Sequence, residues 1–238
     1  MTSHAVVTQD EWLVARQALL AKEKEFTRLR DELSAARRGL PWTEVEKPYR
    51  FEGPAGALGL AGLFAGRSQL VVYHFMFHPD WKAGCKSCSF WADHFAGVAV
   101  HLAQRDVTLA AVSRAPLAML EAFKKRQGWS HTWVSSLGSD FNYDFGVTFT
   151  PEEIAAGPTF YNYRLAGHFK SEERPGISVF FKDAEGAIYH TYSCYARGLD
   201  MLNGTYQFLD IVPKGRDEDG FSMPMAWVRI KDEYSTQA

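Results

Sequence analysis

Short apolar runs alternate with helical repeats through the middle of the chain. Residues 70–77 are almost entirely apolar, which is typical of a strand buried on both faces of a sheet. A polar turn follows, and then a helical pattern that continues to about Gln104. Residues 106–112 form a second apolar run, and a further helix begins at Pro116 and ends at Gly128. This order predicts parallel strands joined by right-handed connections.

The first forty residues carry a different pattern. Thr8 and Glu11 have the spacing of a capping box, so a helix is expected to begin there. It is expected to end near Arg38, because Gly39 follows. Between charged residues, apolar residues repeat every seven positions: Trp12, Leu19, Phe26 and Leu33. We predict a helical arm over residues 1–40, which either packs on its own domain or pairs with a second copy in a homodimer.

The remaining elements are expected to be shorter. Residues 40–66 are rich in Gly and Pro and predict a hairpin or loop followed by a short helix. Residues 177–181 and 187–195 flank a turn that contains glycine, which predicts a β-hairpin. A final helix is expected over residues 199–211, and an edge strand over residues 225–230. We predict that residues 41–238 form one α/β domain.

Composition and charge exclude several classes of function. The 238 residues are 46% hydrophobic and 23% charged, with a formal net charge of −2, so no basic surface for nucleic acid is expected. No apolar run approaches the roughly 20 residues of a membrane span. The N-terminal residues lack the pattern of a signal peptide, and three cysteines are too few for a disulfide framework. We therefore expect a cytoplasmic protein.

Cys85 and Cys88 stand in a C-x-x-C motif between the first strand and its helix, which is the order of a thioredoxin-like redox site. Unpaired N–H groups and the helix dipole at a helix start favour a thiolate, and Lys86 adds positive charge nearby. Cys85 is therefore the predicted nucleophile, and the more buried Cys88 is the predicted resolving cysteine. Such a reaction needs no cofactor, and its electrons come from a cellular thiol.

Other interpretations of the same residues stay open. The pair could consist of two ordinary core cysteines, or it could bind a metal, but of the nearby histidines only His78 is well placed as a further ligand. Asp93 could relay a proton to Cys88, although an exposed helical aspartate is the simpler expectation. Cys194 could be a third redox cysteine or a small core residue.

Two further segments carry weaker predictions. Residues 129–149 are rich in aromatic side chains and are expected to form core and a lid, or to line an apolar pocket above the cysteines. The acidic run over residues 217–219 lacks the spacing of a calcium loop, so we expect it to be solvated.

The chain resembles the thioredoxin/redoxin superfamily, and more closely a bacterial domain-of-unknown-function family described as predicted dithiol–disulfide oxidoreductases. The resemblance covers most of the chain. It is carried by SQLVVYHFMF at 68–77, PDWKAGCKSCSFWADHF at 79–95, DVTLAAVSRAP at 106–116, SDFNYDF at 139–145 and YARGLDMLNGTYQFLD at 195–210. It implies a thioredoxin-like fold, with a central mixed β-sheet flanked by helices and an N-terminal helical arm.

The resemblance also implies roles for individual residues. Cys85 and Cys88 match the redox pair, and Pro175 matches the proline that is cis in thioredoxins and exposes a backbone edge to a substrate peptide. Thioredoxins place Trp directly before the first cysteine, whereas Gly84 stands there in this chain and Trp81 lies further upstream. The predicted substrate contacts are Pro175, Gly84, Trp81 and Lys86. The expected partners are a protein or small-molecule disulfide or thiol and a cellular thiol reductant.

A second activity within the superfamily is peroxide reduction. Peroxiredoxins place Pro seven residues and Thr or Ser three residues before the reactive cysteine. Here Pro79 is six residues before Cys85, and Lys82 replaces the hydroxyl residue. Thiol peroxidase is therefore the alternative to thiol–disulfide exchange, and a metal- or ligand-binding module without turnover is the third interpretation.

Overall fold

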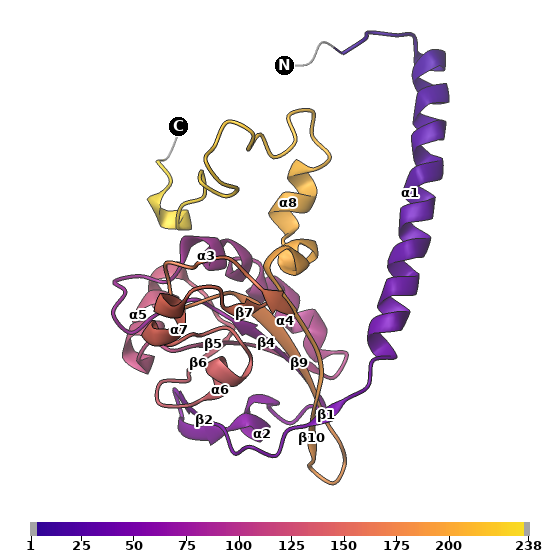
Figure 1. Cartoon of the computed structure of the whole chain (residues 1–238). Coiled ribbons are helices and arrows are strands. Elements are labelled where there is room, and N and C mark those ends of the chain that lie inside the picture. Colours follow the sequence, from indigo (N-terminus) through magenta and orange to yellow (C-terminus); the bar gives the residue numbers. More distant parts are fainter. Residues whose placement is uncertain (1–3, 236–238) are drawn as a thin grey trace. The chain divides into compact units, whose positions relative to one another are not determined.

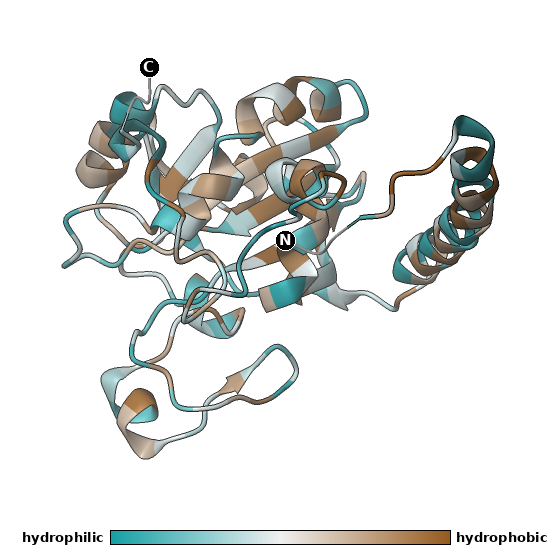
Figure 2. Cartoon of the chain, turned by 90° about the horizontal axis from the view of Figure 1, so that it is seen from above, coloured by the Kyte–Doolittle hydropathy of each residue, from teal (hydrophilic) through white to brown (hydrophobic). Residues whose placement is uncertain are grey.

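The computed structural model describes residues 4–235, and the chain forms two units, Met1–Trp42 and Thr43–Ala238. The first unit contains α1 (Gln9–Arg38), whose thirty residues begin after Thr8 and end before Gly39, as predicted. Thr8 and Glu11 form the expected capping box, in which the Glu11 carboxylate accepts the Thr8 N–H at 2.9 Å. Within the described residues, α1 has no buried side chain, and Figure 2 shows hydrophobic residues between hydrophilic ones along the helix.

An eight-stranded mixed sheet forms the centre of the second unit (Figure 1). Its strands are β1 (Thr43–Glu44), β2 (Arg50–Gly53), β3 (Gly56–Gly59), β4 (Gln69–His74), β5 (Val107–Ser113), β6 (Thr132–Ser135), β9 (Gly176–Lys182) and β10 (Ile188–Tyr195). The strand order is β1-β10-β9-β4-β5-β6-β2-β3. β4, β5 and β6 are parallel, whereas β9 is antiparallel to β4 and β10. A separate hairpin pairs β7 (Phe160–Tyr161) with β8 (Arg164–Leu165).

Short helices connect these strands. They are α2 (Leu60–Leu63), α3 (Lys86–Ala92), α4 (Phe95–Ala103), α5 (Leu117–Gln127), α6 (Phe141–Asp144), α7 (Pro151–Ala156) and α8 (Gly204–Leu209), with 3-10 helices η1 (Ala196–Leu202) and η2 (Lys231–Glu233). The connection β4-α3-α4-β5 gives parallel neighbours, and the hairpin β9-β10 leads into η1 and α8. This arrangement is a thioredoxin-like fold, as predicted.

The sheet separates two hydrophobic cores, because successive side chains of a strand point to opposite faces. On β4, Val72 packs into one core with Leu60, Leu63 and Phe141 from α2 and α6. Its neighbour Tyr73 packs into the other core, with α3, α4 and α5. Cys88 belongs to this second core, so the helices α3 and α4 and the cysteine pair share one face of the sheet.

Four of the predicted elements differ in the structure. β4 ends at His74 because the following backbone turns toward the cysteines. The prediction of a single helix after the cysteines is wrong: α3 ends at Ala92 with Asp93 as its C-cap, and the N–H of His94 then donates to Trp91 O at 3.1 Å in a tighter turn. The final helix is split into η1 and α8.

The edge strand predicted over residues 225–230 is also wrong. Met225 has a positive φ of 63°, and its N–H donates to the Glu218 carboxylate at 3.0 Å instead of to a strand. The N–H of Arg229 donates to the Tyr234 hydroxyl. The buried Val228 and Ile230 pack against the core while the backbone forms turns. Within the described residues, no helix combines the length and the apolar character that crossing a membrane requires.

Candidate functional site

The backbone after β4 holds both cysteines. Cys85 is the N-cap of α3, and its N–H donates to Met76 O at 3.0 Å. The N–H of Met76 in turn donates to the Cys88 sulfur at 3.4 Å. Because Met76 forms both hydrogen bonds, the loop after the central strand fixes the position of the pair. The structure contains the pair as thiols; Cys85 is partly exposed and Cys88 is buried.

Hydrogen bonds favour the thiolate of Cys85. The Cys88 thiol donates to the Cys85 sulfur, and this bond lowers the pKa of Cys85 to about 7 although burial opposes the charge. The N–H groups of Cys88 and Ser87 and the Ser87 hydroxyl act in the same direction. Cys85 is therefore the cysteine of the pair that is ionised near neutral pH.

Cys88 has the opposite tendency. Burial raises its pKa well above the ordinary value, and the neighbouring Cys85 thiolate raises it further. The Tyr73 hydroxyl donates to the Cys88 sulfur and only partly offsets this effect. Tyr73 is itself buried, which raises the pKa of its phenol, so the hydroxyl keeps its proton as a donor. The sequence alone does not identify Tyr73, because only folding places β4 against α3.

Gly84 has a steric role. A Cβ atom at this position would lie 2.7 Å from Cε1 of Phe75 and 3.2 Å from Cε1 of Phe123. Both aromatic rings are buried in the core, so they cannot move away without a cost. This close approach explains why the chain has no tryptophan directly before Cys85.

A cavity of about 660 Å³ adjoins Cys88. Its walls include Tyr73 and Met76 from the cysteine side, and Pro175, the residue before β9. η1, α8 and the segment that follows α8 complete the cavity. This segment packs on α3, since the Lys86 ammonium donates to Ala226 O at 3.2 Å (Figure 1).

Pro175 and Glu218 both line this cavity, and each differs from what the sequence led us to expect. Pro175 lines the cavity together with Cys88, but residues 4–235 contain no cis peptide bond, so the bond before Pro175 is trans, contrary to the resemblance. Its carbonyl accepts the Tyr161 hydroxyl at 2.7 Å. Glu218, expected to be solvated, also lines the cavity and accepts hydrogen bonds from Tyr206, Met225 and Trp227.

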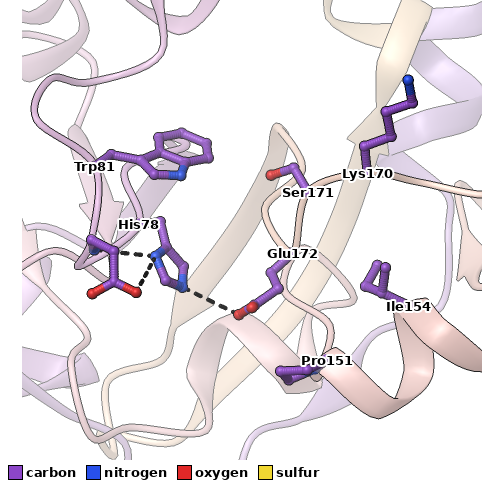
Figure 3. A pocket seen from close by; sticks show the side chains of 8 residues that line it. His78, Trp81, Pro151, Ile154, Lys170, Ser171 and Glu172 are labelled. Atoms are coloured by element: carbon purple, nitrogen blue, oxygen red, sulfur yellow. Dashed lines mark hydrogen bonds and ion pairs between the residues drawn. The ribbon is translucent and has the colours of Figure 1, made fainter.

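Trp81 lies beside a different pocket. This pocket has a volume of about 420 Å³ and contains Trp81, His78 and Glu172, which Figure 3 shows around its opening. The N–H of Asp80 donates to His78 Nδ1, so Nε2 carries the proton and donates to Glu172 at 3.2 Å. Both ring nitrogens of His78 are therefore hydrogen-bonded within the chain. The described residues contain no cluster of three or more His, Cys, Asp or Glu arranged to hold a metal.

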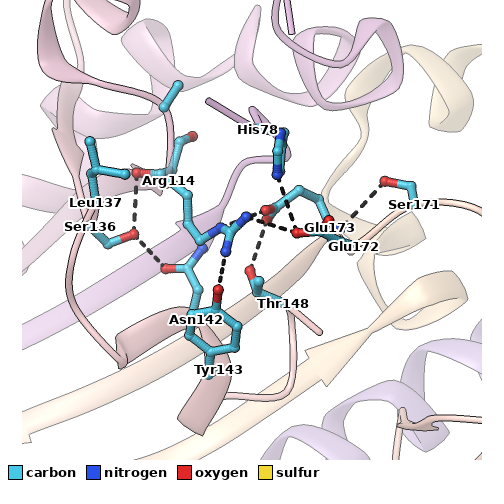
Figure 4. Close-up of polar contacts among 12 residues, drawn as sticks. His78, Arg114, Ser136, Leu137, Asn142, Tyr143, Thr148, Ser171, Glu172 and Glu173 are labelled. Atoms are coloured by element: carbon cyan, nitrogen blue, oxygen red, sulfur yellow. Dashed lines mark hydrogen bonds and ion pairs between the residues drawn. The ribbon is translucent and has the colours of Figure 1, made fainter. Parts of the chain in front are cut away.

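Arg114 links this pocket to the interior (Figure 4). Its guanidinium contacts Glu172 at 3.1 Å and the buried Glu173 at 2.8 Å, and it also donates to the Tyr143 hydroxyl. Thr148 donates to Glu173 at 2.9 Å. Burial raises the pKa of Glu173, and the charge of Arg114 and these hydrogen bonds oppose the shift. The network fastens the end of β5 to the loop that precedes β9.

The remaining predicted site residues lie apart from the sulfur atoms. The Asp93 carboxylate accepts the indole N–H of Trp129 at 2.8 Å and pairs with Lys231 at 2.9 Å, so it is engaged elsewhere. Cys194 is buried in β10, and its thiol donates to Gly198 O at 3.6 Å. The ammonium of Lys86 is directed at the C-terminal segment.

Several solved structures of low sequence identity match the chain. The peroxidoxin BcpB from Mycobacterium tuberculosis is 15% identical, with a TM-score of 0.45 over 70% of this chain and 95% of that chain. A mutant of peroxiredoxin Q from Xanthomonas campestris is 13% identical, with a TM-score of 0.42 over 67% and 90%. A secreted Mycobacterium tuberculosis disulfide oxidoreductase homologous to E. coli DsbE is 16% identical, with a TM-score of 0.36 over 66% and 92%.

No curated protein matches the sequence. The family described as "Bacterial protein of unknown function (DUF899)" matches residues 1–234. This match spans both units of the structure and includes the cysteine motif, Tyr73 and every segment around the cavity. The chain therefore belongs to the DUF899 family of bacterial proteins.

Proposed function

We propose that this protein is a thiol–disulfide oxidoreductase in which Cys85 is the nucleophile and Cys88 is the resolving cysteine. The observation that carries this proposal is the contact between the two thiols. Cys88 donates a hydrogen bond to Cys85 and lowers its pKa to about 7, while Cys88 itself stays protonated because it is buried. A pair with one thiolate and one thiol is the reduced form that exchange requires.

The exchange proceeds in two steps. The Cys85 thiolate attacks one sulfur of the substrate disulfide, and the other substrate sulfur leaves as a thiolate that takes up a proton. Cys88 then loses its proton and attacks the Cys85 sulfur, which forms the Cys85–Cys88 disulfide and releases the second substrate thiol. Two electrons pass from the protein to the substrate, and a cellular thiol reductant restores the pair by the reverse chemistry.

The reduction potential of the pair tests this function directly. The protein is equilibrated in glutathione buffers of different ratio, and the remaining thiols are alkylated and counted. We expect a single two-electron transition between about −120 and about −270 mV, the range of working oxidoreductases. Cys88→Ser should abolish the transition, whereas Cys194→Ser, whose native thiol is directed at Gly198 O, should preserve it.

Other outcomes would favour the other interpretations. A pair that never forms a disulfide would contradict the proposal, and stoichiometric metal in the purified protein would then favour a binding module. Rapid consumption of peroxide, with a sulfenic acid on Cys85, would instead identify a thiol peroxidase.

A further inference from the structure

We propose that the cavity beside Cys88 binds the substrate, and that this substrate is a small, uncharged and largely apolar disulfide. The inference rests on the proposed exchange at Cys85 and Cys88 and specifies the substrate class. A volume of about 660 Å³ lies within the range of small-molecule sites, roughly 300–1,000 Å³. It is too small for a folded protein to enter.

Apolar side chains form one part of the cavity wall. Tyr73, Met76 and Trp91 line it on the core side, and Leu199 and Met223 line it from η1 and the C-terminal segment. The indole N–H of Trp91 donates to Leu199 O at 2.9 Å, so this polar group is already satisfied. A ligand in this part of the cavity is recognised by apolar contact.

Most charged groups of the wall are paired with other groups of the wall. Arg216 donates to Asp200 at 2.8 Å and to Asp210 at 2.6 Å. One oxygen of Glu218 accepts from Tyr206, Met225 and Trp227 at distances of 2.7 to 3.0 Å, and Glu218 has a lowered pKa, so it remains a carboxylate. The lining thus contains two guanidiniums and three carboxylates, a net charge of −1 that disfavours anionic disulfides such as that of glutathione.

The backbone around Pro175 argues against an extended peptide as the substrate. A peptide docked beside a redox pair forms main-chain hydrogen bonds with such an edge. Here the Pro175 carbonyl accepts the Tyr161 hydroxyl at 2.7 Å, and the N–H of Arg174 donates to Val147 O at 2.8 Å. Both backbone groups are therefore already hydrogen-bonded within the chain and are not available to pair with a peptide.

Cys88 lies in the cavity wall, so its thiol is available to protonate the departing substrate sulfur. In the proposed reaction the Cys85 sulfur, which contacts Cys88 but is not itself part of the cavity wall, attacks the bound disulfide, and the Cys88 thiol in the wall protonates the departing sulfur. The resulting Cys88 thiolate attacks the Cys85 sulfur, and the second substrate sulfur takes a proton from solvent. The reactants are the substrate disulfide, the Cys85 thiolate, the Cys88 thiol and one external proton. The products are two substrate thiols and the Cys85–Cys88 disulfide.

Thioether probes test the site without any exchange reaction. The probes are diphenyl sulfide with a carboxamide on each ring, which is uncharged, and the same molecule with two carboxylates. Each is titrated calorimetrically into the reduced full-length protein. We expect saturable one-to-one binding of the diamide, and binding of the dicarboxylate at least tenfold weaker.

A pair of methionine variants locates the binding. Met223→Ala removes an apolar contact from the cavity wall and should weaken diamide binding roughly threefold to tenfold. Met201→Ala changes an exposed methionine of η1 that lies outside the lining, and should leave the affinity unchanged. Absence of saturable binding, equal binding of the dicarboxylate, or equal effects of the two variants would overturn the proposal.

The binding test and the redox test fail in different ways. The thioethers bind without using either cysteine, so a pair that forms no disulfide would overturn the proposed function and leave the ligand site in place. A normal redox transition without diamide binding would retain the oxidoreductase and exclude this substrate class. Reduction of a protein disulfide at a rate above that of uncharged aromatic disulfides would also overturn the inference.

Discussion

At the cysteine pair, one hydrogen bond gives two identical side chains different acidities. Cys88 donates to Cys85, and the Tyr73 hydroxyl and the Met76 N–H both donate to Cys88. Each donor favours negative charge on the sulfur that it contacts, but the burial of Cys88 outweighs its two donors. The negative charge of the reduced pair therefore resides on the more exposed sulfur.

The acidity of Cys85 should depend on the donor at position 88. In the native protein, alkylation of Cys85 by iodoacetamide should reach half of its maximal rate at a pH of about 7. Cys88→Ala removes the donor, so the midpoint should move toward the free-cysteine value of about 8.5, and the rate at pH 7 should fall roughly tenfold. Peptide mapping by mass spectrometry measures the modification of Cys85 alone.

Cys88→Ser is the matched control, because its hydroxyl can still donate to Cys85. Its midpoint should therefore lie below that of Cys88→Ala. Identical midpoints for the two variants would show that the hydrogen bond does not set the acidity.

The sequence was sufficient to identify the cysteine pair, because the spacing of the motif and the start of a helix are local features. The contacts that tune the pair are not local. Tyr73 reaches Cys88 from a strand, and Glu218 reaches the same cavity from 130 residues further along the chain. Glu218 belongs to an acidic run that was expected to be solvated. The hydrogen bonds that it accepts from Tyr206 and Trp227 depend on the fold and cannot be inferred from the spacing of residues in the sequence.

At the scale of elements, those with local signals at their ends were predicted well. α1 begins with a capping box, and α5 ends at Gly128 with a left-handed φ of 64°. The buried strands β4 and β5 were likewise evident from their apolar runs. Where tertiary contacts decide the structure, prediction failed: the break after α3 coincides with the engagement of Asp93 by Trp129 and Lys231.

We predict that α1 pairs with α1 of a second copy. Its residues Trp12, Leu19, Phe26 and Leu33 repeat every seven positions and are 49 to 66% exposed. This spacing is that of a coiled-coil seam. Phe26→Glu places a charge in the seam and should convert a dimer to a monomer in sedimentation equilibrium.

Val14→Ser removes an exposed apolar residue of the same helix outside the heptad positions, so this variant should remain dimeric. A native protein that sediments as a monomer at micromolar concentration would contradict the prediction.

At the scale of the whole molecule, buried histidines link stability to pH. His131 is surrounded by Phe95, Trp129 and Trp133, and neither of its ring nitrogens has a hydrogen-bond partner in the described part of the chain. Burial lowers the pKa of His131 to about 4, and the charges of Lys124 and Lys231 add to this effect. His74 is also buried, which lowers its pKa to about 3.

These shifts predict a loss of stability in acid. Below a pH of about 6.5 the unfolded chain binds protons that the folded protein excludes, so the free energy of unfolding falls as the pH decreases toward 4. His131 alone contributes on the order of 3 kcal/mol to this decrease. Urea unfolding at several pH values measures it, and His131→Phe should give a shallower dependence.

His101→Asn on the exposed side of α4 is the control and should keep the native dependence on pH. An unchanged slope in His131→Phe would contradict the assignment of this proton uptake to His131.

The outer edge of β10 has a consequence for how the protein behaves when it is crowded. Two-residue β1 pairs with β10 at His190 and Tyr189, and the N–H of Val45 donates to Ile188 O at 2.8 Å. The Tyr163 hydroxyl donates to the carbonyl of Ser193 further along. The edge is thus divided into short stretches, whereas intermolecular β-pairing requires a long row of unpaired backbone groups. This side of the sheet is therefore a poor template for aggregation, even at high protein concentration.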